Sequence, residues 1–171
     1  MSEAKSGGCI RADWPFRIVD SLTRPTCYPL CRERRQIMSA AENKRLFENI
    51  FAGLAVGDAK LFLDSLADNF CWTITGTAPW SRTYRGKQAV RTELLRPLFE
   101  QFADQYTNTM QRIIAEDDFV VVECRGRVTT KSGKPYNNTY CWVCRVADGK
   151  LKELTEYMDT ALVATVLQLP A

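Results

Sequence analysis

The sequence predicts an α+β fold in which a curved, mainly antiparallel sheet packs on three helices from the first part of the chain. Three stretches between residues 39 and 102 carry apolar side chains at helical spacing, with one β-rich run among them. Four alternating runs joined by turns follow between residues 106 and 159. Helices followed by strands indicate α+β rather than alternating α/β. We expect the sheet to form a cone whose closed end is core and whose mouth admits a ligand.

Charge and composition divide the 171 residues into two parts. Residues 1–37 contain three prolines and scattered arginines without a sustained period, so we expect a poorly ordered basic extension before a single domain at residues 38–171. The extension carries the whole net charge of +3, because the domain holds 16 basic and 16 acidic side chains. A neutral domain offers no electrostatic footprint for nucleic acid. A natural tail and a translation start at Met38 both stay open, and the acidic residues of the extension argue against a transit peptide.

Composition also excludes several kinds of partner and site. No apolar run approaches the ~20 residues that span a membrane, so we expect no membrane partner. The chain has no histidine, which excludes Ser-His-Asp catalysis, Cys-His catalysis and histidine metal sites. Its seven cysteines, with no secretory signal, predict reduced thiols and a cytoplasmic location. Cys141 and Cys144 fall on opposite faces of a predicted strand, so we expect no metal there and no cofactor elsewhere.

The first two predicted helices have clear start and stop signals. Ser39 and Glu42 have the spacing of a capping box, in which each side chain accepts a hydrogen bond from the backbone of the other. Gly57 ends this helix, and Asp58 begins a second one that ends near residues 68–69. A β-rich run at residues 70–75 follows.

A loop and a third helix come next. The loop at residues 76–85 contains Trp80 and Tyr84, which either pack over the edge of the core or form a lid over a pocket. Gly86 opens the third helix, and Pro97 should kink or break it. Strands are then predicted at residues 106–115 and 119–130, with a turn at Asp117 and Asp118.

The chain is organised around a hairpin at residues 136–159. Asp148 and Gly149 between alternating runs are the strongest short-range signal for a hairpin turn. Alternation predicts two faces for each strand. On the first strand one face carries Asn138, Tyr140, Trp142 and Cys144, and the other carries Thr139, Cys141, Val143 and Arg145. On the second strand one face carries Lys152, Leu154, Glu156 and Met158, and the other carries Leu151, Glu153, Thr155 and Tyr157. Asp159 is then placed to cap a final helix at residues 160–167.

Several of these motifs together resemble a known superfamily over residues 40–166. They are the helix pair joined at Gly57-Asp58, Phe70-x-Trp72, Tyr84-x-Gly86, Tyr136-Asn-Asn-x-Tyr-x-Trp, Asp148-Gly149-Lys150 and Glu156-Tyr157-x-Asp159. The chain resembles the NTF2-like superfamily, and within it the SnoaL-like, ketosteroid isomerase-related proteins. The resemblance implies the cone fold and a homodimer formed through the outer face of the sheet. It leaves the activity open, because this fold hosts isomerases, cyclases, hydrolases and non-catalytic binding proteins.

The resemblance points to different branches at different residues. Ketosteroid isomerases use a tyrosine and an aspartate where this chain has Ile50 and Ile74, which cannot transfer protons. Limonene-epoxide hydrolases carry a catalytic aspartate at the position of Glu156, and polyketide cyclases place an acid close to it. The former also aim an Arg-x-Asp pair into the pocket, and its nearest equivalents here are Glu123 and Arg125.

These residues define a candidate site for a small-molecule ligand. Glu156 lies among apolar neighbours, so desolvation should raise its pKa toward a value useful for proton transfer. Arg125 and Glu123 would assist it, or the three would form a structural ion-pair network. The expected ligand-binding residues are Trp72, Trp80, Tyr84, Asn138, Tyr140 and Trp142. An acid/base enzyme acting on a small, mainly apolar oxygenated molecule and a non-catalytic binding or dimeric scaffold module both remain open.

Overall fold

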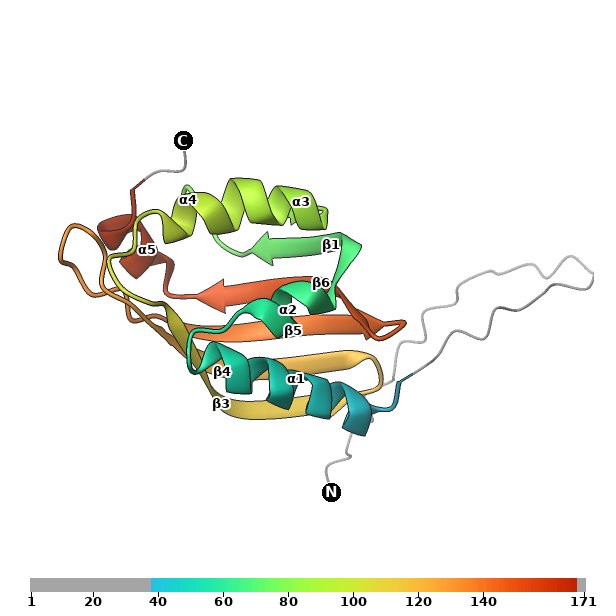
Figure 1. Cartoon of the computed structure of the whole chain (residues 1–171). Helices are drawn as coiled ribbons and strands as arrows, with labels where there is room; N and C mark the ends of the chain where they lie inside the picture. Colours follow the sequence, from blue (N-terminus) through green and yellow to red (C-terminus); the bar gives the residue numbers. More distant parts are fainter. Residues whose placement is uncertain (1–37, 169–171) are drawn as a thin grey trace, which may run out of the picture. The chain divides into compact units, whose positions relative to one another are not determined.

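The computed structural model describes residues 38–168, so the extension predicted at residues 1–37 lies outside the described part. Within it, a six-stranded sheet carries helices on one side, which confirms the predicted α+β class (Figure 1). The elements in chain order are α1 (Ala40–Leu54), α2 (Lys60–Ser65), β1 (Leu66–Ile74), β2 (Thr83–Arg85), α3 (Lys87–Ala89), the π-helix η1 (Val90–Leu95), α4 (Arg96–Phe99), β3 (Thr107–Glu116), β4 (Phe119–Arg127), β5 (Thr139–Ala147), β6 (Lys150–Met158) and α5 (Thr160–Val166).

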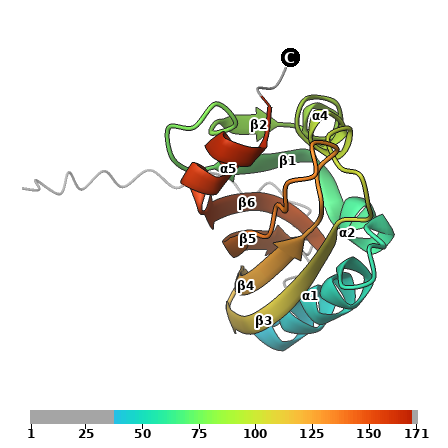
Figure 2. The ribbon, with the colours of Figure 1, turned by 90° about the vertical axis from the view of Figure 1, so that its left-hand side faces the viewer.

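The sheet is mixed, with strand order β2-β1-β6-β5-β4-β3. The predicted four-strand meander is confirmed, since β3 to β6 pair in sequence order and antiparallel. β1 joins the other side of β6 in parallel, and the short β2 continues the sheet from it. Figure 2 shows the sheet curving, with α1, α2 and α4 along one side of it. The buried residues of the inner face include Val120, Val122 and Leu154.

Helix α1 begins and packs as its sequence predicts. The Ser39 hydroxyl accepts a hydrogen bond from the Glu42 backbone N–H, and the Glu42 carboxylate accepts one from the Ser39 backbone N–H at 2.7 Å. Phe47 and Ile50 are buried in the core. Asn43, also buried, donates to the Asp117 carbonyl at 3.0 Å and so ties the helix to the turn between β3 and β4.

The third helical stretch does not break at Pro97. A proline has no N–H and its ring collides with the carbonyl four residues earlier, so an ordinary α-helix cannot continue through it unchanged. Here the backbone widens into η1, and the Arg96 N–H reaches back five residues to the Arg91 carbonyl. The π-turn absorbs the clash, and Pro97 then lies in the first turn of α4.

The β5–β6 hairpin has the predicted turn and one unpredicted irregularity. Asp148 and Gly149 adopt φ angles of 55° and 70°, as a two-residue type I′ turn requires. The pairing then slips by one residue, since Arg145 opposes Glu153 and Val146 opposes Leu151. This bulge leaves Lys152 as the extra residue, so Leu151 and Leu154 are both buried and the expectation of opposite faces for them is wrong.

The remaining differences concern element ends. β1 begins at Leu66 rather than at residue 70, and α2 accordingly ends at Ser65. The predicted loop at residues 76–85 ends in β2, which pairs with β1.

The cap of α5 is confirmed, because Asp159 accepts from the backbone of Ala161 and Leu162. Within residues 38–168, none of the helices has the length and apolar character needed to cross a membrane.

Candidate active site

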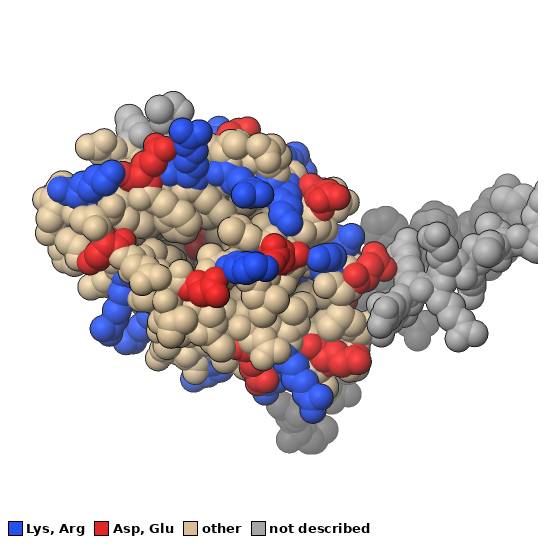
Figure 3. Space-filling model, in the orientation of Figure 1, with Lys and Arg blue, Asp and Glu red and all other residues tan. Residues whose placement is uncertain are grey.

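A cavity of about 260 Å³ lies between the sheet and the helices. Its volume is just below the roughly 300 Å³ at which small-molecule sites usually begin. Figure 3 shows a hollow on the face drawn there, with charged side chains of both signs on the surface around it. Apolar residues from the helices and the segments that follow them line part of the cavity. They include Leu54, Phe62, Leu63, Leu94, Leu95, Leu98, Phe99, Phe102, Val163 and Leu167.

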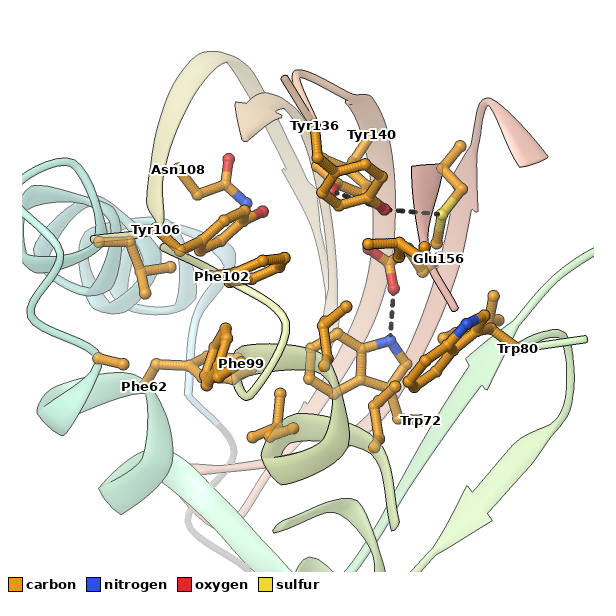
Figure 4. Close-up of a pocket in the computed structure, with 18 of the residues that line it drawn as sticks. Phe62, Trp72, Trp80, Phe99, Phe102, Tyr106, Asn108, Tyr136, Tyr140 and Glu156 are labelled. Atoms are coloured by element: carbon orange, nitrogen blue, oxygen red, sulfur yellow. Dashed lines mark hydrogen bonds between the residues drawn. The ribbon is translucent and has the colours of Figure 1, made fainter. Parts of the chain in front are cut away.

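Glu156 is the buried acidic residue among those that line this cavity. The residue is only 5% exposed, and its position on β6 directly opposes Trp142 on β5. One carboxylate oxygen accepts a hydrogen bond from the Trp72 indole N–H at 2.8 Å (Figure 4). The other accepts one from the Trp142 indole N–H at 3.1 Å. The two indoles meet edge to face at 5.8 Å between ring centroids, and Phe62 packs against both. Packing therefore fixes the orientation of the carboxyl group.

Burial controls the protonation of Glu156. Desolvation raises the pKa of the carboxyl group to about 7, while the hydrogen bonds from Trp142 and Trp72 hold it lower than burial alone would. Near neutral pH the group is therefore present in both its acid and its base form. This is the condition in which one side chain both removes and returns a proton efficiently.

The chemistry of the indole partners also determines which groups can accept a hydrogen bond from the acid form of Glu156. An indole N–H is only a donor, so neither Trp72 nor Trp142 can accept a hydrogen bond from the acid form. Both indoles therefore hold the carboxyl group without competing for its proton. The acid proton is available to a ligand in the cavity.

Tyrosine hydroxyls form a second polar group along the same cavity. Tyr140 on β5 donates to the Tyr136 hydroxyl at 3.4 Å, and Tyr106, before β3, also lines the cavity. Burial raises the pKa of Tyr136 to about 12, and it raises the pKa values of Tyr140 and Tyr106 as well. These phenols therefore stay protonated at neutral pH and can act as hydrogen-bond donors to an oxygen of a ligand.

The structure brings together five of the nine predicted site residues. Those that line the cavity are Glu156, Trp72, Trp80, Tyr140 and Trp142. Trp80 is held in place by its indole N–H, which donates to the Gln168 carbonyl at 3.0 Å, so one aromatic residue of the predicted lid loop does border the pocket.

Tyr84 and Asn138 are buried but do not line the cavity. The Tyr84 hydroxyl donates to the Trp80 carbonyl at 3.3 Å. The Asn138 amide group donates to the Asp159 carbonyl and accepts from the Asp159 N–H, both at 3.1 Å. Both side chains hold the walls of the site rather than face a ligand.

Glu123 and Arg125 do not reach the cavity, which corrects the expectation that they assist Glu156. Both are exposed, while their neighbours Val122 and Cys124 are buried on the inner face of β4. Because strand side chains alternate, the pair lies on the outer face, where Glu123 is 3.7 Å from Arg112. The buried positions of β4 are Val120, Val122, Cys124 and Gly126, so this strand carries no inward-facing equivalent of the Arg-x-Asp pair.

The cavity residues that are not among the predicted site residues include Tyr106, Asn108 and Tyr136. Asn108 is fully buried on β3, which the alternation of that strand could have indicated, since it lies two positions before Met110. Tyr136 was already part of the superfamily motif. Within residues 38–168, no three Cys, Asp or Glu side chains lie close enough together to hold a metal ion.

Comparison with known proteins agrees with this architecture. A sequence profile described as a SnoaL-like domain matches residues 47–154. An NTF2-like protein from Burkholderia thailandensis is 26% identical with a TM-score of 0.63, over 72% of this chain and 95% of that chain. No protein of curated function is significantly similar to this chain in sequence.

Two further solved structures share the fold at lower identity. A structure from Jannaschia sp., described as a SnoaL-like polyketide cyclase, is 17% identical with a TM-score of 0.62, over 82% of this chain and 99% of that chain. TerC, co-crystallized with polyporic acid, is 19% identical with a TM-score of 0.61, over 72% of this chain and 96% of that chain. The profile match spans more than half of the sequence, and the chain therefore belongs to the SnoaL-like domain family and has the NTF2-like fold.

Proposed function

We propose that the protein is a cofactor-free general acid/base enzyme that acts on a small, mainly apolar molecule carrying one or two oxygens. The observation that supports this most is the carboxyl group of Glu156, which lies on the wall of a cavity between two groups that can only donate hydrogen bonds. Reactions of the isomerase, cyclase or hydrolase type would use such a group. Two neighbours of the same fold support an organic ligand, one described as a polyketide cyclase and one co-crystallized with polyporic acid.

The proposed step is a proton transfer at a carbon next to a carbonyl group. The Glu156 carboxylate takes the proton, and the electron pair of the broken C–H bond moves to the carbonyl oxygen to give an enolate. The phenol O–H of Tyr136, whose oxygen accepts from Tyr140, stabilises the enolate oxygen by donating a hydrogen bond. The protonated Glu156 then returns its proton to the same or another carbon, which leaves the enzyme unchanged. In this proposal the tyrosines take the part first expected of Arg125.

Hydrogen–deuterium exchange tests this step without knowledge of the natural substrate. The ketone 2-tetralone in D₂O exchanges the hydrogens next to its carbonyl, and proton NMR follows the loss of their signals. We expect the wild-type protein to accelerate the exchange and Glu156→Gln to lose about 10²-fold or more of that acceleration. The matched control is Glu153→Gln, on the same strand but exposed, which should exchange at the wild-type rate. Equal rates for wild type and Glu156→Gln would remove Glu156 from the mechanism.

The second candidate is a ligand-binding module without chemistry. This candidate is favoured because Arg125 lies outside the cavity. None of the described residues that line the cavity is Lys or Arg, so Glu156 has no cationic partner there. Saturable binding of 2-tetralone, without any acceleration of exchange, is the result that this candidate predicts.

We also propose that the protein is a cytoplasmic homodimer. The four cysteines of the described part are free thiols, which suits a reducing compartment. A row of β-branched side chains crosses the outer face of the sheet, in which Ile114 opposes Val121, Val121 opposes Val143, and Val143 opposes Thr155. Val143→Glu should convert the dimer to a monomer in analytical ultracentrifugation, because it places a charge in the middle of this row. A wild-type monomer would contradict the proposal.

A further inference from the structure

Three aromatic residues form a cluster at one end of the cavity. Phe99 ends α4, Phe102 follows that helix and Tyr106 precedes β3, and all three line the cavity. The distances between their ring centroids are 5.7 Å for Phe99 and Phe102, 6.0 Å for Phe99 and Tyr106, and 5.8 Å for Phe102 and Tyr106. Phe99 is 42% exposed although it lines the cavity, so these three rings, the entrance cluster, lie where the cavity meets the surface.

Asp104 adds a carboxylate to this end of the cavity. It lies between Phe102 and Tyr106 in the chain, and it also lines the cavity. One carboxylate oxygen accepts a hydrogen bond from the Thr129 backbone N–H at 2.7 Å, which fixes the side chain. Within residues 38–168, Asp104 forms no ion pair with Lys or Arg. Its negative charge therefore has no counter-charge in the described part of the protein.

The ionic charges along the cavity are of one sign only. Among residues 38–168, the cavity lining contains the carboxyl groups of Asp104 and Glu156 and no Lys or Arg. An anionic ligand would find no compensating charge in a largely apolar space. A cationic group would find a carboxylate to pair with and aromatic faces that attract cations. The lining therefore favours a cation at the entrance cluster.

The two carboxyl groups differ in position and in exposure. Figure 4 shows Phe99 and Tyr106 on one side of the pocket and Glu156 on the other. Glu156 is buried, whereas Asp104 is exposed. The buried carboxyl group can therefore act on one end of a ligand while the exposed one holds the other end.

Resting on the function proposed above, we propose that Asp104 and the entrance cluster form a binding subsite for a protonated amine. The substrate is then a ketone whose apolar body carries a cationic nitrogen at the end remote from the carbonyl group. The ammonium N–H donates to the Asp104 carboxylate and supplies the counter-charge that this group lacks. The carbon atoms bonded to the nitrogen lie against the aromatic rings, and the carbonyl end reaches Glu156.

Two ketones of the same shape test this subsite. In 6-(dimethylaminomethyl)-2-tetralone the amine is protonated at neutral pH, and in 6-isobutyl-2-tetralone a C–H group replaces its N–H. By isothermal titration calorimetry in low salt, we expect the wild-type protein to bind the amine about fivefold more tightly than the isobutyl compound. Asp104→Asn keeps an oxygen that can accept from Thr129 but removes the charge. It should bind the two ketones within about twofold of each other and exchange 2-tetralone at the wild-type rate.

Asp68→Asn is the matched control, because Asp68 is also exposed but does not line the cavity. This variant should keep the preference for the amine. Phe99→Leu removes one aromatic face and keeps the carboxylate, so it should reduce the preference about twofold. The wild-type preference should also shrink in about 0.5 M salt, because salt screens exposed charges. This last measurement requires no variant, so it applies even if Asp104→Asn fails to fold.

Equal affinity of the wild type for the two ketones, binding of neither, a preference retained in Asp104→Asn, or a preference unaffected by salt each overturns the inference. Asp104 would then serve only to hold the Thr129 backbone. With exchange of 2-tetralone intact, any of these results leaves the proposed function standing. A preference for the amine that depends on Asp104, without any acceleration of exchange, overturns the proposed function instead and supports a subsite in a binding module.

Discussion

The buried carboxyl group of Glu156 should make the stability of the protein depend on pH. Its pKa is about 7 in the folded protein against an ordinary value of 4.5. Because the folded value is the higher one, the stability that Glu156 contributes is fully present below about pH 4.5 and is lost as pH rises through about 7. Each pH unit in this window lowers the free energy of unfolding by about 1.4 kcal/mol, so the total loss is about 3 kcal/mol.

Glu156→Gln removes this dependence and adds a penalty that does not vary with pH. The glutamine oxygen can accept from one indole, but its NH₂ group then faces the N–H of the other, and two donors cannot pair. We expect this mismatch to lower the free energy of unfolding by about 1–3 kcal/mol. The variant should therefore be less stable than wild type in acid and of similar stability at neutral pH.

Urea unfolding followed by circular dichroism between about pH 5 and pH 7 measures both effects. The chain contains no histidine, the side chain that normally titrates in this range, so few other groups obscure the result. The difference between wild type and Glu156→Gln should change by about 2–3 kcal/mol over the window. Curves that stay parallel would refute the reasoning, since Glu156 would then have the same pKa in the folded and unfolded states.

Three further changes test the environment of the site. Trp142→Phe removes a donor to the carboxylate, so it should raise the pKa of Glu156 further and move the loss of stability to higher pH in the same urea titration. Gly126→Ala adds a Cβ that overlaps the Tyr106 hydroxyl, so it should lower the free energy of unfolding by about 1–3 kcal/mol. It should also weaken binding of 2-tetralone, because the Tyr106 ring is pushed toward the cavity. Unchanged stability and affinity would show that the ring moves freely. Arg125→Ala should alter stability by no more than about 0.5 kcal/mol and leave exchange of 2-tetralone unchanged; slowed exchange would contradict its place on the outer face.

The parts of the fold that sequence reasoning predicted are those set by local chemistry. The capping box of Ser39 and Glu42, the Asp148-Gly149 turn and the Asp159 cap each depend on residues within a few positions of one another. The inward direction of Glu156 also followed, because Trp142 and Tyr140 mark the inner face of the hairpin.

The parts that sequence reasoning missed depend on contacts between distant segments. Nothing near β1 indicates that it pairs in parallel with β6, more than 80 positions later. The bulge at Lys152 is hidden because Lys152 and Glu153 are both polar. The alternation of β4 puts Val122 and Cys124 on the face opposite Arg125, so the strand pattern conflicts with the equivalence that the family resemblance implies.

The bulge at Lys152 makes the chemistry of the site depend on a count of residues rather than on their kinds. If the strand ran on from Leu151 without the bulge, regular alternation would turn the side chain of Glu156, five positions later, to the outer face. Deleting Thr155 would do the same with the bulge in place, because Glu156 would then directly follow the buried Leu154. Composition would hardly change, and every aromatic residue of the cavity would remain. A single-codon insertion or deletion in this strand could therefore distinguish relatives whose acid faces the cavity from relatives whose acid faces outward. Aligned residue identities alone would not reveal this difference in side-chain direction.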